Sequence, residues 1–407
     1  MEYGLIGEKL GHSFSKEIHE ILGNPSYELR EIPREELGAF MRQKAFRGIN
    51  VTIPYKQEVI PYLDECSIEA KAIGAVNTIV NENGFLKGYN TDAKGFQLLV
   101  ESIHLSCPGK TAVILGTGGT SHTAEYVLKS MGISVVYKVS RTTKEGAITY
   151  DEIPSDIDLI VNTTPCGMSP NNEDTPLNLD RFPSLSGVID VVYNPLKTRL
   201  IQQAEARKIP AIGGLRMLVG QAIEASKLFL NRDYPSSLLL SVERRVARKR
   251  QNIVLIGMPG CGKSTVGKAL AEQMHRPFFD SDSVIEKENH ISIASFIPKH
   301  GEAAFRKLEE QAIQKLSLLT GAVIATGGGV ILNPKNMERL SQNGVIVFLD
   351  RELSRLAFSS SRPLSSDRES LRKRFEERYS LYHKYADVIV PSTAIRATVE
   401  KIKGALE

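Results

Sequence analysis

Residues 252–265 read NIVLIGMPGCGKST, in which an apolar, β-branched run leads into a glycine-rich turn. Gly257 to Ser264 fits the pattern GxxxxGKS/T, and a helical pattern follows at 266–274. In such a loop the backbone N–H groups cradle phosphates, while Lys263 reaches the outer phosphates and Ser264 ligates Mg²⁺. The stretch therefore predicts a parallel-sheet α/β domain that binds ATP or GTP. Its predicted nucleotide-binding residues are Gly257, Gly260, Gly262, Lys263, Ser264 and Thr265.

A second strand-and-glycine segment, residues 111–119, reads TAVILGTGG and has a different glycine spacing. Gly116, Gly118 and Gly119 would let the backbone approach a pyrophosphate at the start of a helix. Ser121 stands where the GxGxxG pattern has its last glycine. The turn alone therefore fits a dinucleotide site and a plain strand–helix turn equally well.

The strand pattern after this turn favours NADP. Residues 135–140 read VVYKVS and lead to Arg141, 22 residues beyond Gly119, where an NAD site usually places an acid. A guanidinium pairs with the 2′-phosphate of NADP and has no use for a bare hydroxyl. Arg141 and Lys144 are therefore predicted to bind NADP, the alternative being that both are solvated turn cations.

The composition is that of a globular chain with two or three domains. The 407 residues are 42% apolar, and no apolar run reaches the roughly 18 residues of a membrane helix. The N-terminus lacks the basic start and apolar stretch of a signal peptide. No metal-ligand or disulfide spacing links the four cysteines, Cys66, Cys107, Cys166 and Cys261. We therefore expect a cytoplasmic protein without membrane contact.

One short segment carries the excess charge. The net charge is +4, and residues 243–250 (ERRVARKR) hold five basic residues against one acid, which accounts for all of it. So localised an excess argues against a nucleic-acid surface and is typical of a solvated helix end or a linker. We place the boundary between two halves in this segment, near residues 244–250.

The two glycine turns predict two nucleotide sites on separate α/β domains. Residues 1–245 would have a substrate lobe (about 1–95 plus 214–243) and a dinucleotide lobe of the Rossmann type (about 108–213). Residues 251–407 would form a P-loop domain with a lid. Strands are expected in the substrate lobe at Tyr3–Ile6, Gly48–Ile53 and Ala75–Val80.

Candidate residues for phosphoryl transfer follow the P-loop. The run FFDSD at 278–282 ends a strand in two acids, of which Asp280 could hold Mg²⁺ and Asp282 could deprotonate an alcohol. A charged turn is the alternative. Further candidates are Arg306 with Glu309 on one helix face, the TGGG run at 326–329, Arg362 in a serine-rich lid at 359–367, and Arg378 with Tyr382.

The first half offers one candidate pair for carbonyl reduction, which needs a proton donor beside the hydride source. Lys56 follows the strand pattern at 50–55, and Asp92 opens a helical pattern. An aspartate near Lys56 would hold the ammonium in place and tune its protonation. Spacing alone favours a surface lysine and an N-cap aspartate.

Residues 1 to about 243 resemble shikimate dehydrogenase, which changes this interpretation. The matching segments are GHSFS at 11–15, NVTIPYK at 50–56, GAVNT at 74–78, NTD at 90–92, YNPL at 193–196 and MLVGQ at 217–221. The resemblance implies that NADPH reduces 3-dehydroshikimate to shikimate, with Lys56 as acid/base paired with Asp92. It also implies a substrate set: Ser13 and Ser15 on the carboxylate, and Asn77, Asp92 and Gln221 on ring hydroxyls, helped by Asn50, Thr52 and Tyr193.

Two positions depart from that family. His122 stands where the family commonly has an arginine just after the glycine turn, so phosphate contact is expected to be weaker there. Arg216 stands where a glycine is more usual, and a bulky cation is therefore expected beside the nicotinamide pocket.

Residues 251–407 resemble shikimate kinase through the P-loop, FFDSD, FRKLE, TGGG, RPL and the pair of Arg378 and Tyr382. The resemblance implies that Asp282, Gly328 and Gly329 bind shikimate, with Arg306 and Arg378 on its carboxylate. Arg362 would be the lid arginine that stabilises charge on the transferring phosphoryl group.

Together the two resemblances predict a bifunctional enzyme of the shikimate pathway, which leads to the aromatic amino acids, with NADP(H), ATP and Mg²⁺ as cofactors. The 3-hydroxyl that the first half would make is the one that the second half would phosphorylate. Two alternatives remain: a silent half that serves as a regulatory ligand-binding module, and a quinate/shikimate dehydrogenase that uses NAD. The intact catalytic candidates argue against the first (Lys56, Asp92, Lys263, Asp282), and Arg141 argues against the second.

Overall fold

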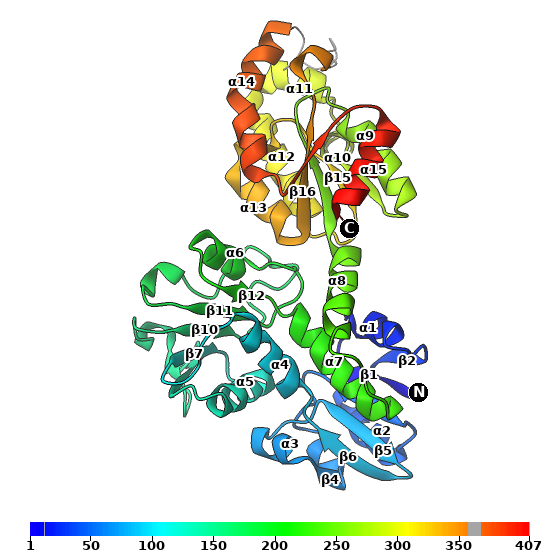
Figure 1. Ribbon diagram of the computed structural model, residues 1–407, viewed down its shortest axis with the longest axis vertical. Helices are drawn as coiled ribbons and strands as arrows, with labels where there is room; N and C mark the ends of the chain where they lie inside the picture. Colours follow the sequence, from blue (N-terminus) through cyan, green and yellow to red (C-terminus); the bar gives the residue numbers. More distant parts are fainter. Residues whose placement is uncertain (12, 357–367, 407) are drawn as a thin grey trace. The chain divides into compact units, whose positions relative to one another are not determined.

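The computed structural model describes residues 1–11, 13–356 and 368–406, which form two compact units, Met1–Ala247 and Arg248–Glu407 (Figure 1). Both units are α/β, as the strand–glycine–helix segments predict. The change of unit falls inside helix α8 (Leu238–Arg250). The basic segment is therefore the end of a helix, and Arg244, Arg245 and Arg248 are exposed on it.

The first sheet of the first unit is mixed. Its strand order is β2-β1-β3-β5-β6-β4, with β1 parallel to β2 and β3, and β5 antiparallel to β3 and β6. The strands are β1 (Tyr3–Gly7), β2 (Tyr27–Glu31), β3 (Gly48–Val51), β4 (Glu65–Cys66), β5 (Thr78–Glu82) and β6 (Phe85–Tyr89). The helices within this stretch of the chain are α1 (Ser15–Ile21), α2 (Leu37–Gln43) and α3 (Ile68–Ile73). The strands expected at Tyr3–Ile6, Gly48–Ile53 and Ala75–Val80 are present, although the second ends at Val51 and the third begins at Thr78 and runs to Glu82.

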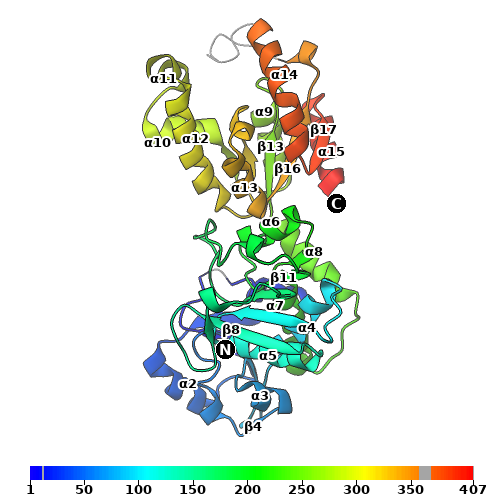
Figure 2. The same ribbon diagram turned by 90° about the vertical axis from the view of Figure 1, so that its left-hand side faces the viewer.

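The second sheet of this unit is wholly parallel, with the order β12-β11-β10-β7-β8-β9. Residues of β7 alternate between two cores: Ala112 and Ile114 pack under helices α4 and α5, and Val113 and Leu115 pack toward α6. Helices α4 and α5 lie on one side of this sheet and α6 lies on the other (Figure 2). The strands are β7 (Thr111–Leu115), β8 (Val135–Ser140), β9 (Ile148–Thr149), β10 (Leu159–Asn162), β11 (Gly187–Asp190) and β12 (Ala211–Ile212). The helices are α4 (Asp92–Ser102), α5 (Gly119–Ser130) and α6 (Arg199–Ala206).

Helix α7 (Leu215–Leu230) joins the two lobes of this unit. Its residues Leu215 and Val219 pack with Phe14 and Ile18 of the N-terminal region, and Met217 lies in the core below α4. Val242 of α8 packs in the same cluster as Leu215. Helix α7 therefore contacts α1, where the predicted carboxylate-binding serines lie, and α4, which begins at Asp92.

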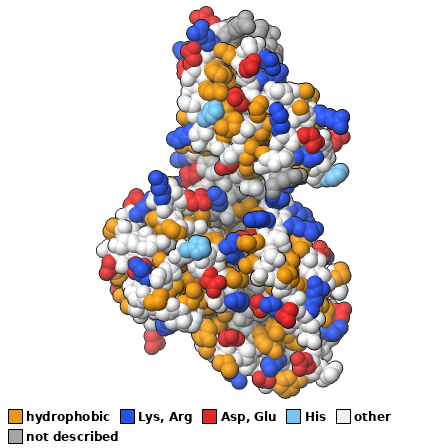
Figure 3. Space-filling view, viewed as in Figure 1, with side chains coloured by type: hydrophobic (Ala, Val, Ile, Leu, Met, Phe, Trp, Pro, Cys, Tyr) orange, Lys and Arg blue, Asp and Glu red, His pale blue; other side chains and the backbone are white. Residues whose placement is uncertain are grey.

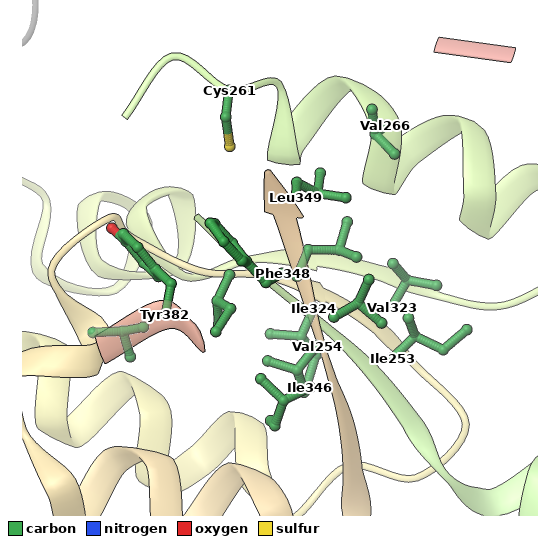
Figure 4. Close-up of a cluster of buried hydrophobic side chains, with 14 of the residues drawn as sticks. Ile253, Val254, Cys261, Val266, Val323, Ile324, Ile346, Phe348, Leu349 and Tyr382 are labelled. Carbon is green, nitrogen blue, oxygen red and sulfur yellow. The ribbon is translucent and has the colours of Figure 1, made fainter. Parts of the chain in front are cut away.

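The second unit has one parallel sheet in the order β14-β15-β13-β16-β17. In its core Ile253, Ile324 and Ile346 come from three neighbouring strands, and Phe348 stacks on Tyr382 with ring centroids 5.1 Å apart (Figure 4). The strands are β13 (Asn252–Ile256), β14 (Phe278–Asp280), β15 (Val323–Ala325), β16 (Gly344–Asp350) and β17 (Val388–Pro391). The helices are α9 (Lys263–Gln273), α10 (Ser281–Asn289), α11 (Ile293–His300), α12 (Glu302–Ser317), α13 (Pro334–Asn343), α14 (Arg368–Tyr385) and α15 (Ile395–Leu406).

The surface carries charges of both signs. On the face in Figure 3, Lys and Arg side chains are interspersed with Asp and Glu side chains in each unit. No helix in the described part of the chain is long and apolar enough to cross a membrane.

Candidate functional sites

Lys56 and Asp92 form an ion pair in the first unit. Lys56 lies in the turns after β3, Asp92 is the first residue of α4, and Nζ of Lys56 donates to Oδ2 of Asp92 at 2.5 Å. The two side chains are only 15% and 9% exposed. A half-buried ammonium held by a carboxylate can give a proton to a substrate oxygen and take it back. The structure thus brings together two residues that spacing alone placed apart.

Asn77 positions the start of α4. Its Oδ1 accepts from the backbone N–H of Thr91 at 2.7 Å, and its Nδ2 donates to Oγ1 of Thr91 at 3.0 Å. Because Asp92 follows Thr91 directly, these contacts also fix where the carboxylate of Asp92 lies. Asn77 is therefore placed next to the pair of Lys56 and Asp92, as its predicted role in binding a ring hydroxyl requires.

Asn50 is held by protein groups at both ends of its side chain. Its Oδ1 accepts from the hydroxyl of Tyr27 at 2.7 Å, and its Nδ2 donates to Oγ1 of Thr78 at 2.9 Å. The ring of Tyr27 stacks on His19 at 3.9 Å, and burial lowers the pKa of His19 to about 3, so His19 is neutral. Asn50 thus belongs to a buried polar network, in which Tyr27 and His19 were not foreseen.

The other substrate candidates of the first unit, Thr52 apart, lie around α1 and α7. The hydroxyl oxygen of Ser13 accepts from the backbone N–H of Ser15 at 3.2 Å, at the start of α1. The ring of Tyr193 lies edge-on to Phe14 at 5.1 Å, and Gln221 is nearly buried on α7. Thr52, directly after β3, is half-buried.

The glycine turn connects β7 to α5. Gly116 has a φ of +110°, and a Cβ on it would lie 2.8 Å from Oγ1 of Thr163, so a side chain is excluded on both grounds. Gly118 caps the helix and Gly119 begins it. A Cβ on Gly119 would lie 3.8 Å from Cδ of Lys56, which places the turn beside the ion pair of Lys56 and Asp92. The N–H groups at this helix start fit the pyrophosphate of a dinucleotide.

The predicted NADP cations lie in the loop after β8, the strand next to β7. Nζ of Lys144 donates to Oγ1 of Thr117 within the glycine turn at 3.1 Å, and Arg141 is exposed directly after β8. His122 is half-buried in the first turn of α5. Cations at this strand end suit a phosphate on the adenosine ribose.

Arg216 makes its contacts with α8 and α4. Its Nε donates to Oε2 of Glu243 on α8 at 2.9 Å, and its NH1 donates to Oγ of Ser102 at the end of α4 at 2.5 Å. The expectation of a cation that reshapes the nicotinamide pocket rested on sequence position alone. The guanidinium links three helices, and an effect of Arg216 on the nicotinamide pocket stays a prediction.

Replacing Arg216 by methionine should lower the stability of the first unit by about 1–2 kcal/mol, because a half-buried charge-assisted hydrogen bond is lost while the stem still packs. The KM for NADPH should change less than twofold. Calorimetric unfolding and steady-state kinetics measure the two effects. A tenfold change in that KM with unchanged stability would place the side chain in the cofactor pocket instead.

In the second unit, the P-loop folds around Lys263. Gly257 has a φ of +148°, and a Cβ on it would lie 2.8 Å from the carbonyl oxygen of Leu349. Nζ of Lys263 donates to the carbonyl oxygens of Gly257 at 2.8 Å and of Met258 at 3.1 Å. The remaining loop residues of the predicted set are Gly260, Gly262 (the cap of α9), Ser264 and Thr265.

Ser264 and Asp280 lie together, as a Mg²⁺ site requires. The hydroxyl of Ser264 donates to Oδ2 of Asp280 at 2.5 Å, and Oδ1 of Asp280 accepts from the N–H groups of Asp282 and Ser283 at the start of α10. Two oxygen ligands suffice for Mg²⁺, since the ion keeps several waters and takes others from phosphates. Within the described residues, no cluster of three His, Cys, Asp or Glu side chains could hold a metal.

Asp282 carries a strongly perturbed carboxyl group. Burial, and then the nearby Asp280 and Glu309 carboxylates, raise the pKa of Asp282 to about 6. Its Oδ1 has no hydrogen-bond partner among the described residues. A carboxylate with a pKa near working pH and a free oxygen can accept a proton from an alcohol.

The predicted carboxylate-binding residues lie around the TGGG segment. Arg306 pairs with Glu309 at 2.8 Å and with Glu302 at 2.6 Å, and its guanidinium lies where a side chain on Gly329 would stand. Arg378 and Tyr382, one turn apart on α14, both donate to the carbonyl oxygen of Gly328, at 3.3 and 2.5 Å. Arg362, the predicted lid arginine, lies outside the described residues.

The pKa of Asp282 predicts an acid limb for phosphorylation. The value of kcat/KM for shikimate should fall about tenfold per pH unit below pH 6, because a protonated Asp282 cannot accept the hydroxyl proton. Initial rates of ADP formation between pH 5 and 8 test this. Circular dichroism at each pH, which shows that the chain stays folded, is the control, and a flat kinase profile down to pH 5 would contradict the assignment.

Comparison with known proteins identifies both units. A family model described as "Shikimate dehydrogenase substrate binding domain" matches residues 5–79, and one described as "Shikimate kinase" matches residues 259–406. The chain is 42% identical over 246 residues to "Shikimate dehydrogenase (NADP(+))" of Clostridium beijerinckii, a match that covers 56% of this chain and 91% of the relative. The chain belongs to the shikimate dehydrogenase family. Its residues 259–406 are a shikimate kinase domain.

Solved structures resemble the dehydrogenase unit. A shikimate dehydrogenase from Peptoclostridium difficile matches with a TM-score of 0.56 and 35% identity, covering 60% of this chain and 98% of that one. A shikimate 5-dehydrogenase from Thermus thermophilus in complex with NADP(H) and shikimate matches with a TM-score of 0.54 and 31% identity, covering 60% and 99%. A chorismate mutase/shikimate 5-dehydrogenase fusion from Clostridium acetobutylicum matches with a TM-score of 0.57 and 32% identity, covering 61% and 97%. These findings confirm the predicted families, fold class and cofactors.

Proposed function

We propose that the dehydrogenase unit reduces 3-dehydroshikimate to shikimate and that the kinase unit phosphorylates the 3-hydroxyl so formed. The observation that supports this most directly is the 2.5 Å pair of Lys56 and Asp92 beside the glycine turn. In the dehydrogenase unit NADPH would supply the hydride, held by the turn at 116–119 with Arg141 and Lys144. The ammonium of Lys56 donates the proton that the carbonyl oxygen takes up, and Asp92 keeps that ammonium in place.

In the kinase unit, Asp282 accepts the proton of the 3-hydroxyl as the oxygen bonds to the γ-phosphorus of ATP, the bond from that phosphorus to the β-phosphate oxygen breaks and ADP leaves. Lys263 stabilises the negative charge on the phosphates, and Ser264 and Asp280 would hold Mg²⁺, which would neutralise part of that charge. Arg306 and Arg378 bind the carboxylate of shikimate, each held by the protein contacts described above. Fixed cations of this kind orient the hydroxyl without reorganisation during the reaction.

The first test is a complete reaction with one purified protein. The chain is mixed with 3-dehydroshikimate, NADPH, ATP and Mg²⁺, and products are identified by mass. Loss of NADPH with formation of shikimate 3-phosphate is the expected result. Shikimate that accumulates without phosphorylation would make the kinase unit a nucleotide-binding regulator, and comparable kcat/KM for NADH and NADPH would contradict the role of Arg141.

The location and partners of the enzyme are also proposals. The four cysteines are unpaired, which suits a reducing cytoplasm. The site residues are suited to small carboxylate and hydroxyl ligands. We infer that the enzyme acts on small molecules and binds neither nucleic acid nor membrane.

A further inference from the structure

Asp190 is a fully buried carboxylate at the end of β11 that no step of the proposed reaction uses. Its Oδ1 accepts from Nδ2 of Asn162 and from the backbone N–H of Val192, both at 3.0 Å. Its Oδ2 accepts from the hydroxyl of Thr198 at 2.6 Å. All three partners donate, so they match an ionised carboxylate. Burial raises the pKa of Asp190 to about 7, and these three hydrogen bonds oppose that rise.

The Asn162 contact leads to the cofactor side. Oδ1 of Asn162 accepts from the N–H of Thr164 at 3.1 Å and from its hydroxyl at 2.6 Å, which fixes the loop after β10. In that loop Thr163 donates to the carbonyl oxygen of Leu115 at 2.7 Å and fills the space beside Gly116. The loop that Asn162 holds is therefore packed against the glycine turn.

The Val192 and Thr198 contacts lead to the substrate side. The carbonyl oxygen of Val192 accepts from the N–H of Gly214 at 2.9 Å, directly before α7. Tyr193, the next residue, packs on Phe14 beside the predicted carboxylate serines. Thr198 also caps α6 by accepting from the N–H of Ile201. One carboxylate thus joins three segments that border the two binding regions.

We propose that Asp190 is a positioning residue of the dehydrogenase, whose buried charge locks the loops after β10 and β11 so that the NADP site is preformed. The inference rests on the proposed function. It assigns Asp190 no contact with substrate or cofactor. If the inference holds, disturbing the hydrogen bonds of the Asp190 carboxylate should weaken NADPH binding itself, because a loop that must be ordered on binding lowers affinity.

The test exchanges the two side chains of the buried pair, at pH 8, where Asp190 is ionised. Asn162→Asp sets two carboxylates against each other and should raise the Kd for NADPH at least tenfold, measured by nicotinamide fluorescence. The double variant N162D/D190N restores one carboxylate and one amide, and should recover at least fivefold of that loss. A general loss of folded protein would lower kcat and leave the Kd of the remaining folded enzyme unchanged, so Kd is the deciding measurement.

If N162D does not fold, a milder pair of variants tests the positioning role of Asp190. Thr198→Val removes the donor to Oδ2 and should raise the Kd for NADPH about fivefold, whereas Thr198→Ser keeps the hydroxyl and should stay within twofold. Kinase activity of each preparation shows that the chain is otherwise intact. Unchanged Kd in N162D and T198V, or a double variant no better than N162D, would overturn the inference. Wild-type protein that fails to bind NADPH would instead overturn the proposed function.

Discussion

Replacing Lys56 by methionine is expected to lower kcat for reduction of 3-dehydroshikimate about a thousandfold and to leave phosphorylation of added shikimate unchanged. Methionine keeps the length and apolar stem of the side chain but has no proton to give. General acid catalysis contributes about 10²–10⁴ in rate, and no other described ammonium lies against Asp92. NADPH oxidation measured without ATP gives the first activity, and ADP formation gives the second.

Lys94 provides the matched control for this variant. It is exposed on α4, two residues from Asp92, and it donates to Gln97 on the surface. Lys94→Met should therefore leave both activities within twofold of wild type. Retention of more than a tenth of kcat in K56M would show that the proton comes from another group. Loss of kinase activity in K56M would show that the substitution damages the whole chain.

Some parts of the two sites could be predicted from the sequence because the patterns that indicate them are local. The strands β7 and β13 are buried branched runs that end in glycines, and the P-loop carries its spacing within eight residues. Lys56 and Asp92 are different, since they are 36 residues apart and lie together through tertiary contacts, such as that of Asn77, directly before β5, with Thr91 at the start of α4. Their pairing could therefore be predicted only from the family resemblance, and the structure then placed the two side chains together.

Other parts depend on contacts that no local pattern encodes. Tyr27 is the single buried residue of β2, so that strand has no alternating apolar pattern to find. Arg216 bonds to Glu243 on α8, and no local sequence pattern predicts that these two residues lie together. Asp190 lies in a four-residue strand and takes its role from donors in three different segments.

Replacing Lys263 by methionine is expected to lower kcat for phosphorylation about a thousandfold, since removing one preorganised charge-stabilising group costs about 10²–10³ and Lys263 supplies a full charge. Its ammonium is nearly buried and held by two loop carbonyls, so it is in place before ATP binds. Dehydrogenase activity should not change. Lys268→Met, an exposed position on the same helix α9, is the matched control and should leave both activities intact.

Mixing the two variants gives the strictest test that each lysine serves one reaction only. From 3-dehydroshikimate, NADPH and ATP, K263M alone should accumulate shikimate, and K56M alone should form no product. Equal amounts of both should form shikimate 3-phosphate, because shikimate released by one chain can be phosphorylated by the other. A K263M sample that accumulates no shikimate, or a K56M sample that forms product from 3-dehydroshikimate, would contradict the assignment of one lysine to each reaction. If the mixture forms shikimate 3-phosphate more slowly than wild type at the same concentration of each active unit, the fused chain delivers shikimate internally, and the ratio of wild-type to mixture rates measures that advantage as an effective concentration.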